Sequence, residues 1–254
     1  MRTVASEPPI YDRIGVGYAS RRKPDARFFA RILEALTGCE TVLNIGAGTG
    51  SYEPPTCALA IEPSWTMIGQ RPAGAARCVR AVAEHLPLRD RSFDASLAIL
   101  TMHHWKDAKA GLAEMRRVTR KRIVLFTWDP GADREFWLTR DYFPAILEID
   151  RRRFPSMRLL REALARVQVQ AVPVPADCQD GLFGAFWQRP EAYLDPVIQR
   201  SNSAMAQMDP AQVRSGIDRL RRDLAAGTWS RRNSSLKSLS ALDLGYRLIV
   251  SEPG

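Results

Sequence analysis

The sequence has no uncharged apolar stretch of the roughly 18 residues that a membrane-spanning helix requires. Its first ten residues contain Glu7, Pro8 and Pro9, whereas a secretory signal would place an apolar run there. Internal repeats and low-complexity linkers are absent as well. We therefore expect a cytoplasmic protein that does not enter a membrane.

Cysteine and histidine are scarce, with four and three residues respectively. Cys39, Cys57, Cys78 and Cys178 lie 18, 21 and 100 residues apart, and no Cys-x-x-Cys pair occurs. Zinc sites and disulfide frameworks show closer, paired spacings. The sequence thus predicts free thiols in a reducing compartment and no metal site.

Acidic residues are fewer than lysine and arginine residues, so the 254-residue chain carries a formal net charge of +9. A basic surface can attract nucleic acid, anionic lipid or an acidic substrate. The arginine runs at 151–153 and 221–222 nevertheless lie among apolar residues with helical spacing, which favours solvated helix faces. No recognisable RNA-binding module accompanies them, so nucleic acid is an unlikely partner.

Apolar segments in the first half alternate between two periodicities. Phe29, Ile32, Leu33 and Leu36 recur with helical spacing and predict an amphipathic helix over 25–37. Further helices are expected at 65–70 and after the cap residue Asp107. Short apolar runs predict strands at 41–45, 57–61, 77–82, 93–100 and 122–126. This alternation predicts an α/β fold with a Rossmann-like, doubly wound, mostly parallel sheet and helices on both faces.

The second half is less regular. It predicts a helix over 135–149, a strand over 167–174 and a last strand at 246–250. About 65 residues separate the last two strands, and they include a helix that begins at Pro210 and ends before Gly227. We expect this segment to form a helical lid inserted before the last strand.

Three glycines, Gly46, Gly48 and Gly50, follow the first expected strand directly. Glycine is needed where the backbone turns sharply and a ligand must touch it. A dinucleotide-binding fingerprint would add a glycine at position 51, where this chain has Ser51. Glu62 ends the next strand, where a carboxylate can accept hydrogen bonds from both ribose hydroxyls. The pattern therefore favours a nucleoside ligand without a pyrophosphate, although Glu62 could also be a simple surface acid.

Here the chain resembles the class I S-adenosylmethionine-dependent methyltransferases, and more narrowly the type 11 group of small-molecule methyltransferases. Four blocks carry the resemblance in the family's order: LNIGAGTG at 43–50, AIEPSWTMI at 60–68, AEHLPLRDRSFDASLAILTMHHW at 83–105 and EMRRVTRKRIVLF at 114–126. The resemblance implies S-adenosylmethionine as the cofactor and transfer of its methyl group to a small-molecule acceptor at an oxygen, nitrogen or carbon atom.

The same resemblance assigns roles to individual residues. The glycine segment, with Asn44 and Ala47, would wrap the methionine part of the cofactor, and Glu62 with Pro63 would hold the ribose. Ala83 and Glu84 would lie beside the adenine, and Leu100 and Thr101 below the sulfonium. The upstream segment YDRIGVGYASRR is similar to a helix that closes over the cofactor in many of these enzymes. It supplies three candidate contacts: Tyr11, Tyr18 and Arg22.

Two positions depart from the family pattern. Asn44 stands where the family usually has an acid, so it adds no charge to balance the cofactor's ammonium group. Val82 replaces another acid and cannot hydrogen-bond the adenine amine. Weak cofactor affinity, or a non-catalytic protein that binds S-adenosylmethionine in a regulatory role, is therefore an alternative.

His103 is the candidate catalytic base, because a neutral imidazole near the sulfonium can remove a proton from the acceptor. Packing of the His-His-Trp segment against the next helix is the structural alternative. Aromatic walls suit a cationic cofactor and a flat substrate. The candidate substrate-binding residues are His104, Trp128, Cys178, Trp187 and Tyr193.

These inferences combine into a single methyltransferase domain over 1–254. Residues 1–38 would form cofactor-covering helices, 39–129 the cofactor-binding core, 130–240 the substrate-side and lid insertion, and 241–254 the last strand. The competing functions are RNA methylation, the non-catalytic role and, fourth, a dehydrogenase, which absence of binding to NAD or NADP would remove. The sequence does not indicate an oligomeric state.

Overall fold

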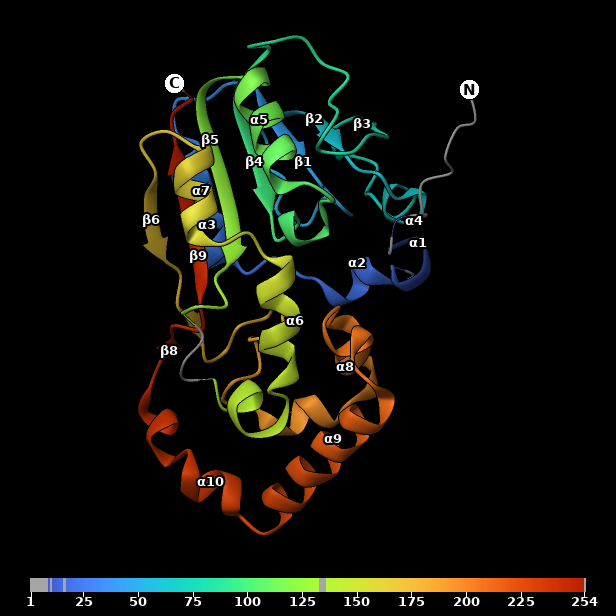
Figure 1. Cartoon of the computed structure of the whole chain (residues 1–254), viewed down its shortest axis with the longest axis vertical. Coiled ribbons are helices and arrows are strands. Elements are labelled where there is room, and N and C mark those ends of the chain that lie inside the picture. Colours follow the sequence, from blue (N-terminus) through green and yellow to red (C-terminus); the bar gives the residue numbers. More distant parts are fainter. Residues whose placement is uncertain (1–8, 10, 16, 133–135, 254) are drawn as a thin grey trace.

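The computed structural model describes residues 9, 11–15, 17–132 and 136–253. Its centre is a seven-stranded sheet in the order β3-β2-β1-β4-β5-β9-β6 (Figure 1). Neighbouring strands from β3 to β5 are parallel, whereas β9 is antiparallel to both β5 and β6. The strands are β1 Val42–Ile45, β2 Cys57–Ile61, β3 Cys78–Val79, β4 Phe93–Ile99, β5 Thr119–Trp128, β6 Gln168–Ala171 and β9 Tyr246–Ser251.

Each face of the sheet has its own apolar core, because successive side chains of a strand point to opposite faces. On β5, Val124 and Phe126 pack with Phe28 and Ile32 of helix α3 (Ala26–Ala35). Ile123 and Leu125 point the other way and share a core with helices α5 (Ala108–Val118) and α7 (Met157–Ala163). Both faces of the sheet are therefore covered by helices, as the alternating pattern predicts.

A group of helices from the second half of the chain lies beyond the sheet, in the lower half of the molecule as drawn in Figure 1. A short two-stranded ladder of β7 (Val174–Pro175) and β8 (Ala241–Leu242) marks where the chain leaves the sheet region and returns to it. Within the part of the chain that the structure describes, no helix is both long and apolar enough to span a bilayer. The helices of this half are α6 Ala145–Arg153, α8 Pro196–Ser201, α9 Pro210–Ala225 and α10 Thr228–Arg232.

Local sequence signals explain the ends of several helices. Asp25, Asp107 and Asp209 each accept hydrogen bonds from backbone N–H groups of the first turn, which caps α3, α5 and α9. Gly227 follows α9 with a φ of +68°, a left-handed conformation that glycine adopts without strain. The predicted strands 41–45, 57–61, 93–100 and 122–126 and the helix before Gly227 all correspond to observed elements.

Some sequence predictions need correction. On α3, Leu33 is exposed and Phe29 only half-buried, because Phe28 together with Ile32 and Leu36 forms the buried stripe. The strand predicted over 77–82 is reduced to the two residues of β3. The segment 167–174 does not form one strand, since β6 belongs to the main sheet and β7 to the small ladder.

The helix predicted over 135–149 is the largest difference. Glu135 lies outside the described residues, and the segment after it forms a π-helical turn over Leu138–Tyr142 and then the separate helix α6. Pro144 precedes α6 and cannot donate a backbone hydrogen bond, so it breaks the periodic pattern there. The break redirects α6 toward the strand ends, where its last turn meets the candidate site.

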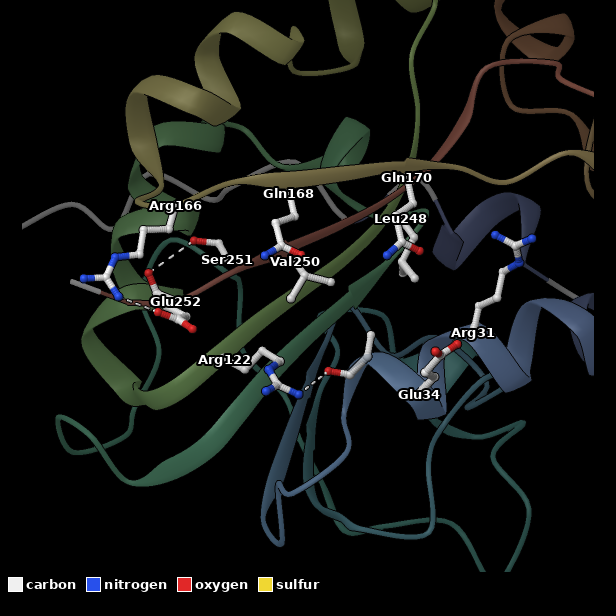
Figure 2. A pocket seen from close by; sticks show the side chains of 11 residues that line it. Arg31, Glu34, Arg122, Arg166, Gln168, Gln170, Leu248, Val250, Ser251 and Glu252 are labelled. Carbon is white, nitrogen blue, oxygen red and sulfur yellow. Dashed lines mark hydrogen bonds and ion pairs between the residues drawn. The ribbon is translucent and has the colours of Figure 1, made fainter.

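One groove of about 420 Å³ lies between α3 and the β9–β6 edge, near the amino end of β5 (Figure 2). Several of its charged side chains are bonded within the protein itself. Arg166 pairs with Glu252 at 2.8 Å, and Arg122 donates to the carbonyl oxygens of Ala35 and Thr37 at the end of α3. The groove lies away from the carboxyl ends of the parallel strands, where the glycine segment is found.

Candidate active site

A cavity of about 970 Å³ lies at the carboxyl ends of β1, β2 and β4. Open α/β sheets bind ligands at this end of their strands. The structure gathers around it all the predicted cofactor residues except Gly50: Tyr11, Tyr18, Arg22, Asn44, Gly46, Ala47, Gly48, Glu62, Pro63, Ala83, Glu84, Leu100 and Thr101.

The glycine loop after β1 requires glycine for two reasons. Gly46 and Gly48 have φ values of +65° and +54°, which residues with a Cβ rarely adopt. A Cβ on Gly46 would also approach Thr101 Oγ1 to 2.0 Å, so the backbone could not lie this close to the end of β4. Gly50, at φ +86°, faces Arg71 and does not line the cavity.

Glu62 extends from the end of β2 into the cavity wall and is almost fully buried. Its Oε2 accepts a hydrogen bond from Gly48 N and its Oε1 one from Ser64 N, each at 2.9 Å. Burial raises the pKa of this carboxyl, while the two backbone N–H groups oppose that shift. A carboxylate oxygen has a second lone pair, so Glu62 can still accept hydrogen bonds from ligand hydroxyls.

The two departures from the family pattern have different surroundings. Asn44 Nδ2 lies 3.3 Å from Glu53 Oε2, and that carboxylate is neutralised by Arg71 at 2.6 Å. The charge missing at Asn44 is therefore not restored by Glu53. Val82 lines the cavity and is 42% exposed, while neighbouring Glu84 accepts hydrogen bonds from the backbone of the loop before α5.

Short N-terminal helices, α1 (Tyr11–Ile14) and α2 (Tyr18–Arg21), contribute to the same cavity. Asp12 of α1 accepts a hydrogen bond from Ser64 Oγ at 2.6 Å, which ties this segment to the start of helix α4 (Trp65–Ile68). After α2, Arg22 binds both carboxylate oxygens of Asp180, a fully buried residue from the second half of the chain. The N-terminal segment thus joins the sheet and the insertion across the cavity.

A second, inner chamber of about 100 Å³ adjoins the first. Tyr11, Tyr18, Arg22 and Leu100 line both, so the chamber opens at the end of β4. Many of its remaining walls are aromatic. Its further lining includes His103, Trp128, Asp150, Phe154, Phe183, Tyr193, Asn202, Ser203, Met205 and Tyr246.

His103 and His104 sit in a short 3-10 turn, and their ring centroids lie 3.8 Å apart. His103 faces the inner chamber and stacks on Phe154 with ring centroids 4.2 Å apart, whereas His104 faces the larger cavity and meets the edge of Tyr11. Burial lowers the pKa of His103 well below its usual value and that of His104 to about 3. Among the described residues, His103 Nδ1 and His104 Nε2 have no hydrogen-bond partner.

The structure separates the other predicted substrate residues into two groups. Trp128 and Tyr193 line the inner chamber. Cys178 and Trp187 line neither cavity, because both are fully buried in the apolar core. The Trp187 indole donates to Val174 O, and burial raises the pKa of the Cys178 thiol to about 12, which makes it a poor nucleophile.

Sequence reasoning missed several chamber residues, among them Asp150, Phe154 and Tyr246. Asp150 and Phe154 lie one helical turn apart at the end of α6, and Tyr246 begins the antiparallel strand β9. No local motif marks them, because their proximity arises only when α6 and β9 converge. The i,i+4 spacing of Asp150 and Phe154 was the one available signal that they share a helix face.

The residues present fit a nucleoside cofactor that carries a sulfonium. Backbone can approach a ligand at Gly46 and Gly48, Glu62 offers acceptors for ribose hydroxyls, and Tyr11 and Tyr18 offer aromatic faces near Leu100. The strand order with its antiparallel β9 and this site define a Rossmann-like methyltransferase of class I.

Comparison with known proteins supports the same assignment. The family model described as "Methyltransferase domain", of the type 11 group, matches residues 43–126. A proposed methyltransferase from an antibiotic biosynthesis pathway of Anabaena variabilis is 32% identical, with a TM-score of 0.84 over 91% of this chain and 98% of that one. The chain belongs to the S-adenosylmethionine-dependent methyltransferases of class I, type 11, and S-adenosylmethionine is its cofactor.

More distant solved structures share the fold. A methyltransferase of Thermotoga maritima is 18% identical with a TM-score of 0.58, covering 96% of this chain and 99% of that one. Phosphoethanolamine N-methyltransferase 2 of Haemonchus contortus, in complex with S-adenosylmethionine, is 12% identical with a TM-score of 0.51. The match covers 89% of this chain and 51% of that one. No curated protein sequence matches the chain significantly.

Proposed function

We propose that this methyltransferase acts on a small molecule that is bound in the inner chamber. The observation that carries the proposal is the chamber itself, which adjoins the cofactor cavity at Leu100 and is walled by residues of the insertion such as Tyr193 and Met205. At about 100 Å³ it suits a compact acceptor. A polymer would need an open surface beside the cofactor.

In this proposal the cavity residues keep the roles that the resemblance implies. The glycine loop holds the methionine part of the cofactor, Glu62 the ribose, and Ala83 with Glu84 the adenine. Leu100 and Thr101 lie below the sulfonium, and Tyr11, Tyr18 and Arg22 cover it. His104 belongs to this set rather than to the substrate residues, because it lines the larger cavity.

The cofactor supplies a methyl group already activated by its sulfonium, so the protein must mainly align the acceptor and exclude water. Leu100 lies at the junction of cavity and chamber, where an acceptor atom would meet the methyl group. Tyr11 and Tyr18 cover the same junction from the N-terminal side. Their rings lie edge to face at 5.4 Å and restrict the entry of water.

His103 is suited to receive the acceptor's proton. It is neutral at physiological pH, because its pKa is lowered by burial and further by the nearby His104, Arg153 and Arg22. Its Nδ1 is buried without a partner among the described residues. The same low pKa makes the resting imidazole a weak base, so His103 accepts the proton only as methyl transfer makes the acceptor more acidic.

Calorimetric titration with S-adenosylmethionine, S-adenosylhomocysteine and NAD is the first test. We expect micromolar binding of the first two and none of NAD. Turnover is then followed as S-adenosylhomocysteine release with a low-mass cell extract and, separately, with an RNA fraction. Release with the low-mass extract alone supports the proposal. Tight cofactor binding without release in either fraction would favour the non-catalytic role.

Replacement of His103 by asparagine tests the base. If His103 receives the proton, His103→Asn lowers kcat about 10²- to 10⁴-fold, the usual contribution of a positioned base. The dissociation constant for S-adenosylhomocysteine is unchanged, because His103 does not line the cofactor cavity. A normal kcat would assign His103 to packing against Phe154.

A further inference from the structure

Asp150 is a buried carboxylate that accepts few hydrogen bonds from the protein. Its side chain is 8% exposed and lines the inner chamber from the last full turn of α6. Its single hydrogen bond among the described residues comes from Arg153 Nη1, at a long 3.3 Å. Buried carboxylates usually accept two or more well-placed hydrogen bonds, so Asp150 retains capacity for another donor.

The two arginines near the chamber are already paired with carboxylates: Arg153 with Asp150 itself, through Nη1 at 3.3 Å, and Arg22 with Asp180. Arg153 donates to Ser203 Oγ at 3.1 Å and lines neither the chamber nor the cofactor cavity. Arg22 is held by both oxygens of Asp180 and donates to Tyr18 Oη at 2.8 Å. The carboxylate of Asp150 thus lines the chamber with Arg153 behind it, and neither arginine supplies an unpaired positive charge to the chamber.

Aromatic rings make up much of the remaining wall. Trp128 meets the edge of Phe154 at 5.4 Å, and Tyr193 and Tyr246 complete this side of the chamber. The faces of such rings carry negative potential and attract cations. Negative charge at one point and aromatic rings around it together complement an ammonium group.

We propose that the inner chamber binds a positively charged nitrogen of the methyl acceptor, with Asp150 as its counter-ion. This inference rests on the proposed function and names the class of its substrate, a small amine. Burial raises the pKa of Asp150 to about 6. A bound cation would stabilise the ionised carboxylate and lower that pKa again.

The position of Asp150 also restricts which atom receives the methyl group. A protonated nitrogen has no lone pair, so the nitrogen held by Asp150 anchors the molecule and is not itself methylated. Phe154, one turn after Asp150, stacks on His103 near the cofactor side. The acceptor is therefore an amine with a second nucleophilic atom that reaches His103.

Binding to the protein saturated with S-adenosylhomocysteine tests the charge preference without turnover. The probes are 2-phenylethylamine, its neutral counterpart 2-phenylethanol and the anion 3-phenylpropanoate, titrated by calorimetry at pH 7.5. We expect the amine to bind at least about tenfold more tightly than either other probe, the usual gain from a charged hydrogen bond. Equal or undetectable binding of the amine would overturn the inference.

Asp150→Asn, which keeps the shape of the side chain, should remove this preference. Asp218→Asn is the matched control, because Asp218 pairs with Arg221 at the same i,i+3 spacing on the exposed face of α9. Wild-type preference in Asp150→Asn would overturn the role of Asp150. If the wild type does not bind S-adenosylhomocysteine at all, the proposed function itself is refuted. Failure of the proposed function and failure of this inference therefore give different results.

Discussion

Leu100 shows how one residue connects the two cavities. Its φ of +47° is unusual for a residue with a Cβ, and such conformations cost on the order of 1–3 kcal/mol. A hydrogen bond from its backbone N–H to Phe126 O, at 2.7 Å, ties it to β5. Because Leu100 lines both cavities, the strain is located where cofactor and acceptor would meet.

Gly46 should tolerate no side chain. In Gly46→Ala the new Cβ would collide with Thr101 and the residue would be held at a positive φ. We expect a loss of stability of about 2 kcal/mol or more and no detectable binding of S-adenosylmethionine. Urea unfolding and calorimetry measure the two effects. Gly74→Ala is the control, since no atom lies within 4 Å of its Cβ position. Normal binding by Gly46→Ala would remove the loop from the cofactor site.

Asp150 should give stability a distinctive pH dependence. Burial raises its folded pKa to about 6 from a reference value of 3.8, so folding favours the protonated form. This stabilisation is fully present below about pH 4 and is lost as pH rises through 6. The unfolding free energy of Asp150→Asn minus that of the wild type should therefore increase between pH 4 and pH 7, by at most about 3 kcal/mol. Urea unfolding at both pH values measures it, and a constant difference would contradict the raised pKa.

At the scale of elements, the N-terminal helices are attached at both ends of the cofactor cavity. Asp12 binds the start of α4, and Arg22 binds Asp180 of the insertion. Tyr52 reinforces the second attachment, because its hydroxyl donates to Asp180 Oδ2 and accepts from Asp25 N. The cover over the cavity is therefore coupled to the insertion that walls the inner chamber.

Asp180→Asn should break that coupling. Loss of its charge leaves the largely buried Arg22 without a counter-ion, which costs about 3–5 kcal/mol of stability. Arg22 lines the cavity, so affinity for S-adenosylhomocysteine should fall as well. Urea unfolding and calorimetry give both values. Asp177→Asn is the control. Asp177 pairs with Arg27 in an exposed setting, so its replacement should change neither stability nor affinity. Equal behaviour of the two variants would contradict a structural role for the buried pair.

The elements also show where sequence reasoning works. The glycine loop, Glu62 and the strand ends were predictable, because the cofactor side is built from short contiguous motifs. The buried stripe predicted for α3 was shifted, since Leu33 has helical spacing but is exposed, whereas Phe28 is buried. The inner chamber was largely unpredictable, because Pro144 interrupts the helix before α6 and only the folded chain brings Asp150 and His103 into one chamber. Arg22 was a candidate from its segment, but its partner Asp180 lies 158 residues away.

At the scale of the whole molecule, the order of the strands decides where the insertion lies. The antiparallel β9 pairs with β5 between Ile123–Ser251 and Trp128–Tyr246, so the chain enters β9 beside the carboxyl end of β5. The segment from β7 to β8 must therefore lie beyond the carboxyl ends of the parallel strands, below the sheet in Figure 1. Those strand ends also carry the cofactor cavity, and the topology thus places the insertion over the site.

The net charge of +9 keeps RNA methylation as the competing whole-molecule function. Many arginines are already paired with acids, as in the Arg117–Asp90 and Arg158–Glu162 pairs, and the proposed acceptor chamber is small and lined largely by apolar and aromatic side chains. We therefore expect transfer RNA to bind only as a polyanion, with a dissociation constant of about 10⁻⁴ to 10⁻⁶ M at physiological salt. Fluorescence anisotropy at 50 and 200 mM KCl should show steep weakening that an equally charged single-stranded DNA reproduces. Salt-resistant binding, strengthened by S-adenosylhomocysteine and joined by methyl incorporation into RNA, would instead make RNA the acceptor.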